Sequence, residues 1–183
     1  MTTLLFPDNT VLINFVVMGR VDVLDKIAGS GRSAWCATVA VECRKSSKVD
    51  GLHDLVRMND IFGDPLYPET AVEHLAVAMF RTRLASPGDE PHKHLGEAET
   101  LAILVNRDDL SGAFVTDDAD ATRLARYEGV AVYDTFDLLK LAFRTNLMGS
   151  REIWTCVETL RRKGRKVRAE LSTEAKVEYW LYH

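Results

Sequence analysis

Acidic side chains stand directly after two short apolar segments that have the composition of buried strands. Asp8 comes after the first segment, 4–6, and three aspartates come after the second, 113–115. Those three are Asp117, Asp118 and Asp120. Because the carboxyl ends of parallel strands lie at one edge of a sheet, we expect these carboxylates to converge there.

Three glutamates at the starts of predicted helices extend this acidic set. Glu42 follows an apolar stretch in a helix predicted to begin after Thr38, and a lone buried glutamate is costly unless it has a partner or a function. Glu97 and Glu99 open a helix predicted over 96–106. Being two residues apart on a helix, they point to different faces, so only one of them is expected to reach a shared site.

Carboxylates gathered in this way repel one another unless a cation lies among them. Oxygen ligands without neighbouring histidine or cysteine suit Mg²⁺ or Mn²⁺. Two such ions can activate water and neutralise a scissile phosphate without a covalent nucleophile. The alternative for Asp8, Asp117 and Asp118 is a purely structural role as helix N-caps, which aspartate commonly fills.

The segments that position these acids alternate between short apolar strands and amphipathic helices. This alternation predicts an α/β fold, in which a central parallel sheet is covered by helices on both faces in three layers, α/β/α. A helix starting at Pro68–Thr70 is expected to bury a face with an apolar composition. Strands are predicted at 4–6, 34–37, 112–116 and 130–133, with a further short one at 61–62. The apolar face expected for the helix that starts at Pro68–Thr70 comprises Val72, Leu75, Ala76, Met79 and Phe80.

Near residue 149 the chain changes character. Residues 1–148 are predicted to form the α/β domain, and 149–183 a C-terminal helical extension docked on the same core. The extension contains a strongly basic run, 161–168, which either contacts RNA by counterion release or is a solvated helix end. His92 and His94 are interpreted as surface side chains of a polar loop.

Composition sets broad limits on the function. The chain has 183 residues and a net charge of −4, which argues against a generally basic nucleic-acid binder. Its three cysteines lack zinc-type spacing and are expected to be reduced and mostly buried. The N-terminus lacks the features of a signal peptide, and no apolar run approaches the ~20 residues of a membrane helix. We therefore expect a cytoplasmic protein with no membrane partner.

Four motifs in order resemble those of the PIN-domain nucleases, and in particular a bacterial and archaeal branch with a Gly-Glu-Ala-Glu sequence. The tail over 149–171 also looks like that branch, so the resemblance extends over nearly the whole chain. The motifs are PDNTVLIN (7–14), TVAVE (38–42), GEAETLA (96–102) and VTDDADA (115–121). The resemblance implies Mg²⁺- or Mn²⁺-dependent hydrolysis of RNA. Many relatives are toxins of the VapC type, so it also implies a possible small antitoxin partner and a possible homodimer.

Carried over by position, the resemblance assigns catalytic roles to five acids: Asp8, Glu42, Glu97, Asp117 and Asp118. The metal ligands would be Asp8, Glu97, Asp117, Asp118 and Asp120. Glu97 is preferred to Glu99 because it occupies the family's acidic position, whereas the choice between Asp117 and Asp118 stays open. Auxiliary roles fall to Thr10, Thr116 and Glu99, and weak substrate contacts to Arg44 and Lys45.

Other functions compatible with acidic residues at strand ends need residues that can be compared with this sequence. A phosphatase or a DNA structure-specific nuclease would use the same carboxylates, but a haloacid-dehalogenase-like phosphatase needs a second aspartate that is missing after Asp8. A receiver-type signalling domain needs an aspartate on a middle strand, and 34–37 contains none. A catalytically idle PIN-like module that binds RNA or protein stays open.

Overall fold

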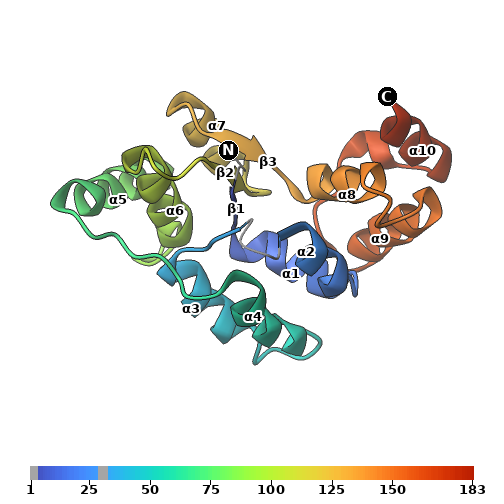
Figure 1. Ribbon diagram of the computed structural model, residues 1–183, viewed down its shortest axis with the longest axis horizontal. Coiled ribbons are helices and arrows are strands. Elements are labelled where there is room, and N and C mark those ends of the chain that lie inside the picture. The colour runs from blue at the N-terminus through green and yellow to red at the C-terminus, as the bar shows by residue number, and fades with distance from the viewer. Residues whose placement is uncertain (1–3, 29–32) are drawn as a thin grey trace.

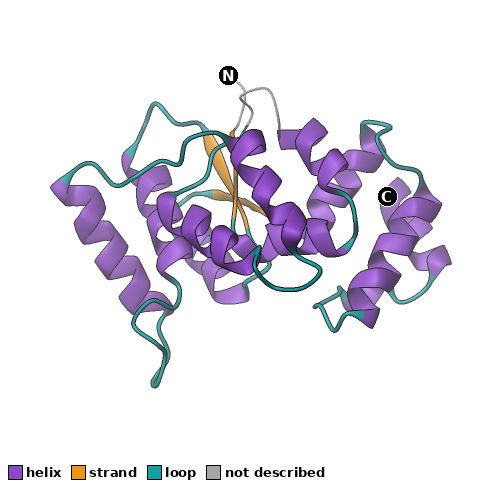
Figure 2. Cartoon of the chain, turned by 90° about the horizontal axis from the view of Figure 1, so that it is seen from below, coloured by secondary structure: helices purple, strands orange, loops and turns teal. Residues whose placement is uncertain are grey.

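The computed structural model describes residues 4–28 and 33–183, which form an α/β fold around a three-stranded parallel sheet. The strands follow the order β1-β2-β3, with Phe6 opposite Phe114 and Phe114 opposite Val132. Helices lie on both sides of the sheet (Figure 1), and the strands lie in the interior of the molecule (Figure 2). The strands are β1 (Leu4–Pro7), β2 (Gly112–Val115) and β3 (Ala131–Tyr133).

Ten α-helices and two short 3-10 helices make up most of the remaining described chain. The helices before β2 are α1 (Asn9–Val17), α2 (Val21–Ala28), α3 (Ala37–Ser46), η1 (His53–Arg57), α4 (Met58–Phe62), α5 (Ala71–Leu84) and α6 (Leu95–Asn106). Those after it are α7 (Ala119–Tyr127), α8 (Thr135–Arg144), α9 (Ser150–Arg162), η2 (Ala169–Leu171) and α10 (Glu174–Tyr182).

Side chains of β2 contribute to two hydrophobic clusters. Phe114 packs in a smaller cluster with residues of α5, α6 and α7, whereas Val115 belongs to a larger cluster that includes α1, α2, α8 and α9. Successive residues of a strand point to opposite faces, so this short strand is covered on both sides. Both side chains are fully buried, which agrees with the continuous apolar composition of a parallel strand enclosed by helices.

The C-terminal segment shares the main core. Ile153, Val157 and Leu160 of α9 and Val177 and Leu181 of α10 are buried in the same cluster as the residues of α1 and α8. The segment 149–183 therefore packs onto the α/β unit through an apolar face, although its helices stand at one end of the molecule (Figure 1).

The structure corrects several sequence-based expectations. The predicted strand at 34–37 forms only isolated bridges, Leu5 with Ser33 and Cys36 with Leu66, and the predicted strand at 61–62 is the end of α4. The strand β3, expected to be buried, is largely exposed because it lies at the edge of the sheet. Helix α3 begins at Ala37 and its N-cap is Cys36, two residues earlier than the predicted cap at Thr38.

The predicted buried face of helix α5 differs most from the structure. Val72, Leu75 and Met79, predicted to face the core, are 63%, 62% and 53% exposed. Of the predicted face, Phe80 is buried as expected, and the other buried residues of the helix are Glu73 and Leu84. The expectation of buried cysteines is confirmed, since Cys36, Cys43 and Cys156 are all free and buried. Among the described residues, none of the helices combines the length and apolar character needed to cross a membrane.

Candidate active site

Asp8 occupies the junction between β1 and α1 and is only 4% exposed. Its Oδ1 accepts a hydrogen bond from the Val11 amide at 2.8 Å, which caps α1, and its Oδ2 accepts one from the Thr116 hydroxyl at 2.5 Å. Thr116 directly follows β2, so the carboxyl ends of the two neighbouring strands meet at this carboxylate. Asp8 thus fills the predicted cap position and the predicted place at the sheet edge together.

Asp117 is held in place by three hydrogen bonds from residues distant in sequence. Its Oδ1 accepts from the Thr135 amide at 2.9 Å, and its Oδ2 accepts from the Thr135 hydroxyl at 2.6 Å and from the Asn14 amide group at 2.7 Å. Asn14 is 2% exposed and Thr135 is fully buried. Helix α1 and the start of α8 therefore orient this carboxylate jointly.

Asp118 and Asp120 have other local partners. Oδ1 of Asp118 accepts hydrogen bonds from the amides of Asp120 and Ala121, both at 2.8 Å, and so caps α7. The Asp120 carboxylate is largely exposed and forms an ion pair with Arg123. The carboxylates whose charges raise the pKa of Asp8 are Asp117 and Glu97. The structure thus brings Asp117 to Asp8, while Asp118 and Asp120 are engaged by α7.

Glu97 and Glu42 continue the acidic group on helices α6 and α3. Burial, together with the charges of Glu97 and Glu99, raises the pKa of Glu42 to about 7, although the charge of Lys45 opposes the shift. Glu97 also contributes to the raised pKa of Asp8. Glu97 therefore interacts electrostatically with both Asp8 and Glu42.

Glu99 has a structural role. It is 7% exposed, and its carboxylate accepts hydrogen bonds from the Thr38 amide at 3.2 Å and the Thr38 hydroxyl at 2.5 Å. Thr38, the predicted N-cap of α3, therefore does not cap that helix. Its side chain instead donates a hydrogen bond to Glu99 of α6. These bonds join the two helices that carry Glu42 and Glu97.

The close approach of α3 and α6 leaves little room for a side chain at position 96. A Cβ atom there would lie 3.0 Å from Cγ2 of Val39 and 3.2 Å from Oε2 of Glu42. Contacts this short would require the Val39 and Glu42 side chains to shift slightly. Gly96 therefore sets how near Glu42 can lie to the helix that carries Glu97.

The electrostatics of this group favour a bound cation. Burial, together with the charges of Asp117 and Glu97, raises the pKa of Asp8 to about 8, although hydrogen bonds from Thr116 and Val11 oppose the shift. The donor set, all carboxylate oxygens, suits Mg²⁺ or Mn²⁺. Among residues 4–28 and 33–183, however, no three carboxylates, histidines or cysteines lie close enough together to hold one ion. The chemistry of the site fits a divalent ion that is bound by one or two carboxylates and completed by water.

The predicted auxiliary residues have different surroundings. Thr116 is 1% exposed and bonded to Asp8, as described above, whereas Thr10 is exposed and its backbone carbonyl accepts from Arg165 at 3.4 Å. Arg44 and Lys45 are both exposed on α3. Of these two, Lys45 influences Glu42, whose pKa it lowers.

Four residues of the site were missed from the sequence. Asn14 and Thr135 orient Asp117, and Nε of Arg165 donates to Oδ1 of Asn14 at 2.7 Å. His94, interpreted as a surface residue, is mostly buried, with Nδ1 3.6 Å from Oε1 of Glu97. A polar Asn14 among the apolar residues of α1 was a usable signal, and Arg165 lies in the basic run that was considered as an RNA contact. Thr135 has no local feature that points to the site.

Comparisons of the chain with protein-family models, with curated proteins and with solved structures gave no match.

Proposed function

We propose that this protein is a Mg²⁺- or Mn²⁺-dependent endoribonuclease of the PIN-like type, with its centre at Asp8, Glu42, Glu97 and Asp117. The observation that carries the proposal is the meeting of Asp8 and Asp117 at the carboxyl ends of β1 and β2, with Glu97 beside them. Helices on both sides of a parallel sheet agree with the three-layer architecture of such nucleases. A toxin role with a small antitoxin, and a homodimer, are further parts of the proposal.

The residues would divide the work according to their surroundings. Asp8 and Asp117 would hold the cation together with water, and Glu97 would add negative charge nearby. When bound, the cation would supply positive charge to the scissile phosphate and lower the pKa of water. Glu42, with a pKa raised to about 7, is suited to accept a proton from the attacking water on a carboxylate oxygen. Asn14 and Thr135 would keep Asp117 in one orientation.

The test is cleavage of a mixed panel of RNAs by the purified protein with Mg²⁺, Mn²⁺ or EDTA. Asp8→Asn and Glu97→Gln should each reduce cleavage at least ~100-fold, because each removes a negative charge from the cation site. Asp22→Asn, which changes an exposed carboxylate on α2, is the matched control and should cleave normally. Cleavage that persists in EDTA, or in both site variants, would refute the metal–carboxylate mechanism.

A second candidate is a nucleic-acid-binding protein of the same fold without catalysis. It is favoured by the spacing of the carboxylates, since among the described residues no three are close enough to hold one ion. This candidate predicts RNA binding without cleavage in either metal. The same RNA panel therefore distinguishes the two functions.

A further inference from the structure

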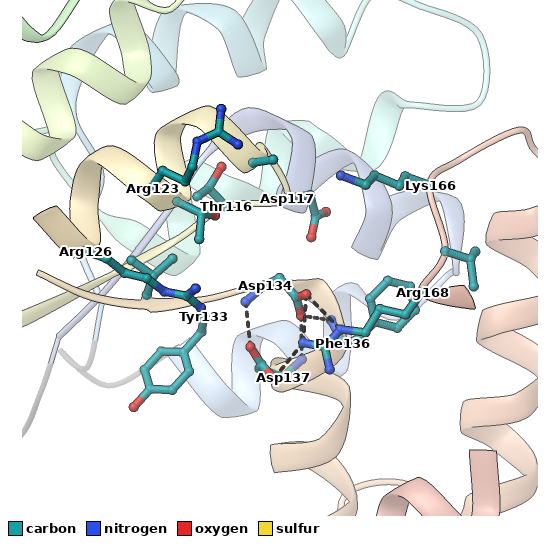
Figure 3. Close-up of a pocket in the computed structure, with 14 residues that line it drawn as sticks. Thr116, Asp117, Arg123, Arg126, Tyr133, Asp134, Phe136, Asp137, Lys166 and Arg168 are labelled. Carbon is teal, nitrogen blue, oxygen red and sulfur yellow. Dashed lines mark hydrogen bonds and ion pairs between the residues drawn. The ribbon is translucent and has the colours of Figure 1, made fainter. Parts of the chain in front are cut away.

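A cavity of about 370 Å³ opens beside the acidic group. Thr116 and Asp117 form part of its wall, so it adjoins the proposed centre directly. Figure 3 shows the cavity between α7, the end of β3, the start of α8 and the loop that follows α9. The candidate site and this cavity thus share one carboxylate.

Basic side chains enter the cavity from two parts of the chain that are distant in sequence. Arg123 and Arg126 come from α7, whereas Lys166 and Arg168 come from the loop after α9. In Figure 3, Lys166 extends toward Asp117 from one side, and Arg126 lies on the opposite side. The cavity is therefore bordered by cations on two sides.

Two of the four cations already have anionic partners. Arg123 is paired with Asp120, and Arg168 bonds Asp134 and Asp137, each at 2.8 Å. Among the residues that the structure describes, the side chains of Arg126 and Lys166 have neither an ion-pair partner nor a hydrogen-bond partner. These two are the cations available to an anionic ligand.

The loop that carries Lys166 is fixed at both of its neighbours. Arg165 donates to Oδ1 of Asn14 at 2.7 Å, and Arg168 is anchored to the two aspartates at the start of α8. Gly164, with a φ of 68°, makes the turn that leads from α9 into this loop. Lys166 is consequently held beside the site before any ligand binds, which reduces the entropy lost on binding.

We propose that this cavity binds the phosphodiester next to the scissile one in a single-stranded nucleic acid, with Lys166 and Arg126 as its phosphate contacts. The proposal rests on the proposed function for the position of the scissile phosphate, which lies at Asp117 and its neighbours. A strand held at Lys166 would present its adjoining phosphate to that acidic group. The recognition is of the backbone and is independent of base identity.

The test is binding, measured in EDTA by fluorescence anisotropy with a 5′-labelled single-stranded 12-mer, as RNA and as DNA of the same sequence. Without metal no cleavage interferes, so a failure of the nuclease proposal leaves this experiment readable. Lys166→Gln and Arg126→Gln should each weaken binding about tenfold at low salt and lower the slope of log K against log salt by ~0.7. The double variant should lose both contributions.

Lys163→Gln is the matched control, because Lys163 belongs to the same basic run but does not line the cavity. It should bind within about twofold of the unmodified protein. Circular dichroism of each variant checks that the fold is intact. Unchanged affinity and salt slope in folded Lys166→Gln and Arg126→Gln would overturn the proposal. A loss of affinity for the RNA 12-mer alone would also overturn it, since a contact to a backbone phosphate affects RNA and DNA alike.

Discussion

Asp117 and Asp118 are adjacent and chemically identical, yet their hydrogen bonds serve different purposes. Asp117 accepts hydrogen bonds from Asn14 and Thr135, which fix its orientation, whereas Asp118 accepts hydrogen bonds from two amides of α7 as its N-cap. Of these two neighbours, Asp117 is the one whose charge contributes to the raised pKa of Asp8. The pair therefore allows a comparison within one dipeptide.

Asp117→Asn is expected to reduce RNA cleavage at least ~100-fold, because it removes a negative charge beside Asp8. Asp118→Asn should retain most of the activity, since asparagine caps a helix about as well as aspartate. Rates of cleavage under Mn²⁺ saturation, with thermal melts of both variants, provide the comparison. Equal loss in the two variants would show that Asp118 also belongs to the centre.

Helix α5 shows how a single ion pair can set the rotation of a helix. Glu73 is 2% exposed and accepts a hydrogen bond from Nε of Arg107 at 2.6 Å, while it also caps the helix through the amide of Thr70 at 3.0 Å. Turning Glu73 inward places Phe80 and Leu84 on the buried side. The apolar stripe of Val72, Leu75 and Met79 is left exposed as a result.

Substitutions on the two sides of α5 should therefore differ sharply in their effect on stability. Leu75→Lys is expected to change the free energy of unfolding by no more than about 0.5 kcal/mol, as is usual for exposed positions. Phe80→Ala should cost about 3–5 kcal/mol through a cavity between α5 and α6. Urea denaturation measures both free energies of unfolding. A large decrease for Leu75→Lys would indicate that Leu75 faces the core, as expected from the sequence.

The whole molecule contains buried acids whose protonation is linked to folding. Burial and like charges raise the pKa of Asp8 to about 8 and that of Glu42 to about 7. In the unfolded chain both carboxyls titrate near pH 4. Between these values the folded state binds more protons, so its stability falls as the pH rises.

In EDTA the melting temperature is expected to decrease by roughly 5 °C or more from pH 5.5 to pH 8, and Asp8→Asn should flatten this dependence. Glu73 does not titrate in this pH range, because its hydrogen bond with Arg107 lowers its pKa to about 2. Its protonation affects stability only in more acidic solution. Mn²⁺ should raise the melting temperature most at pH 8, because it binds the ionised carboxylates of the folded state. Differential scanning calorimetry gives these values, and a melting temperature that rises over the range in EDTA would contradict the assignment.

Local patterns in the sequence were sufficient for much of the framework. The apolar runs at 4–6 and 112–116 are strands, the helices of the acidic motifs lie within a residue or two of their predicted bounds, and Asp8 caps α1. These features depend on short-range periodicity and on the hydrogen bonds of helix ends, which neighbouring residues provide. That the acids meet at one edge follows in addition from the geometry of parallel strands.

The choice among neighbouring acids depended on contacts between distant parts of the chain. Thr135 donates a hydrogen bond to Asp117, and Thr38 donates one to Glu99. Arg165, from the C-terminal extension, donates one to Asn14. No local pattern specifies such pairs, because each hydrogen bond exists only once helices far apart in sequence have packed on the same sheet. The tertiary structure therefore decided which carboxylates face one another, which ones hold the fold together, and that a basic loop lies beside them.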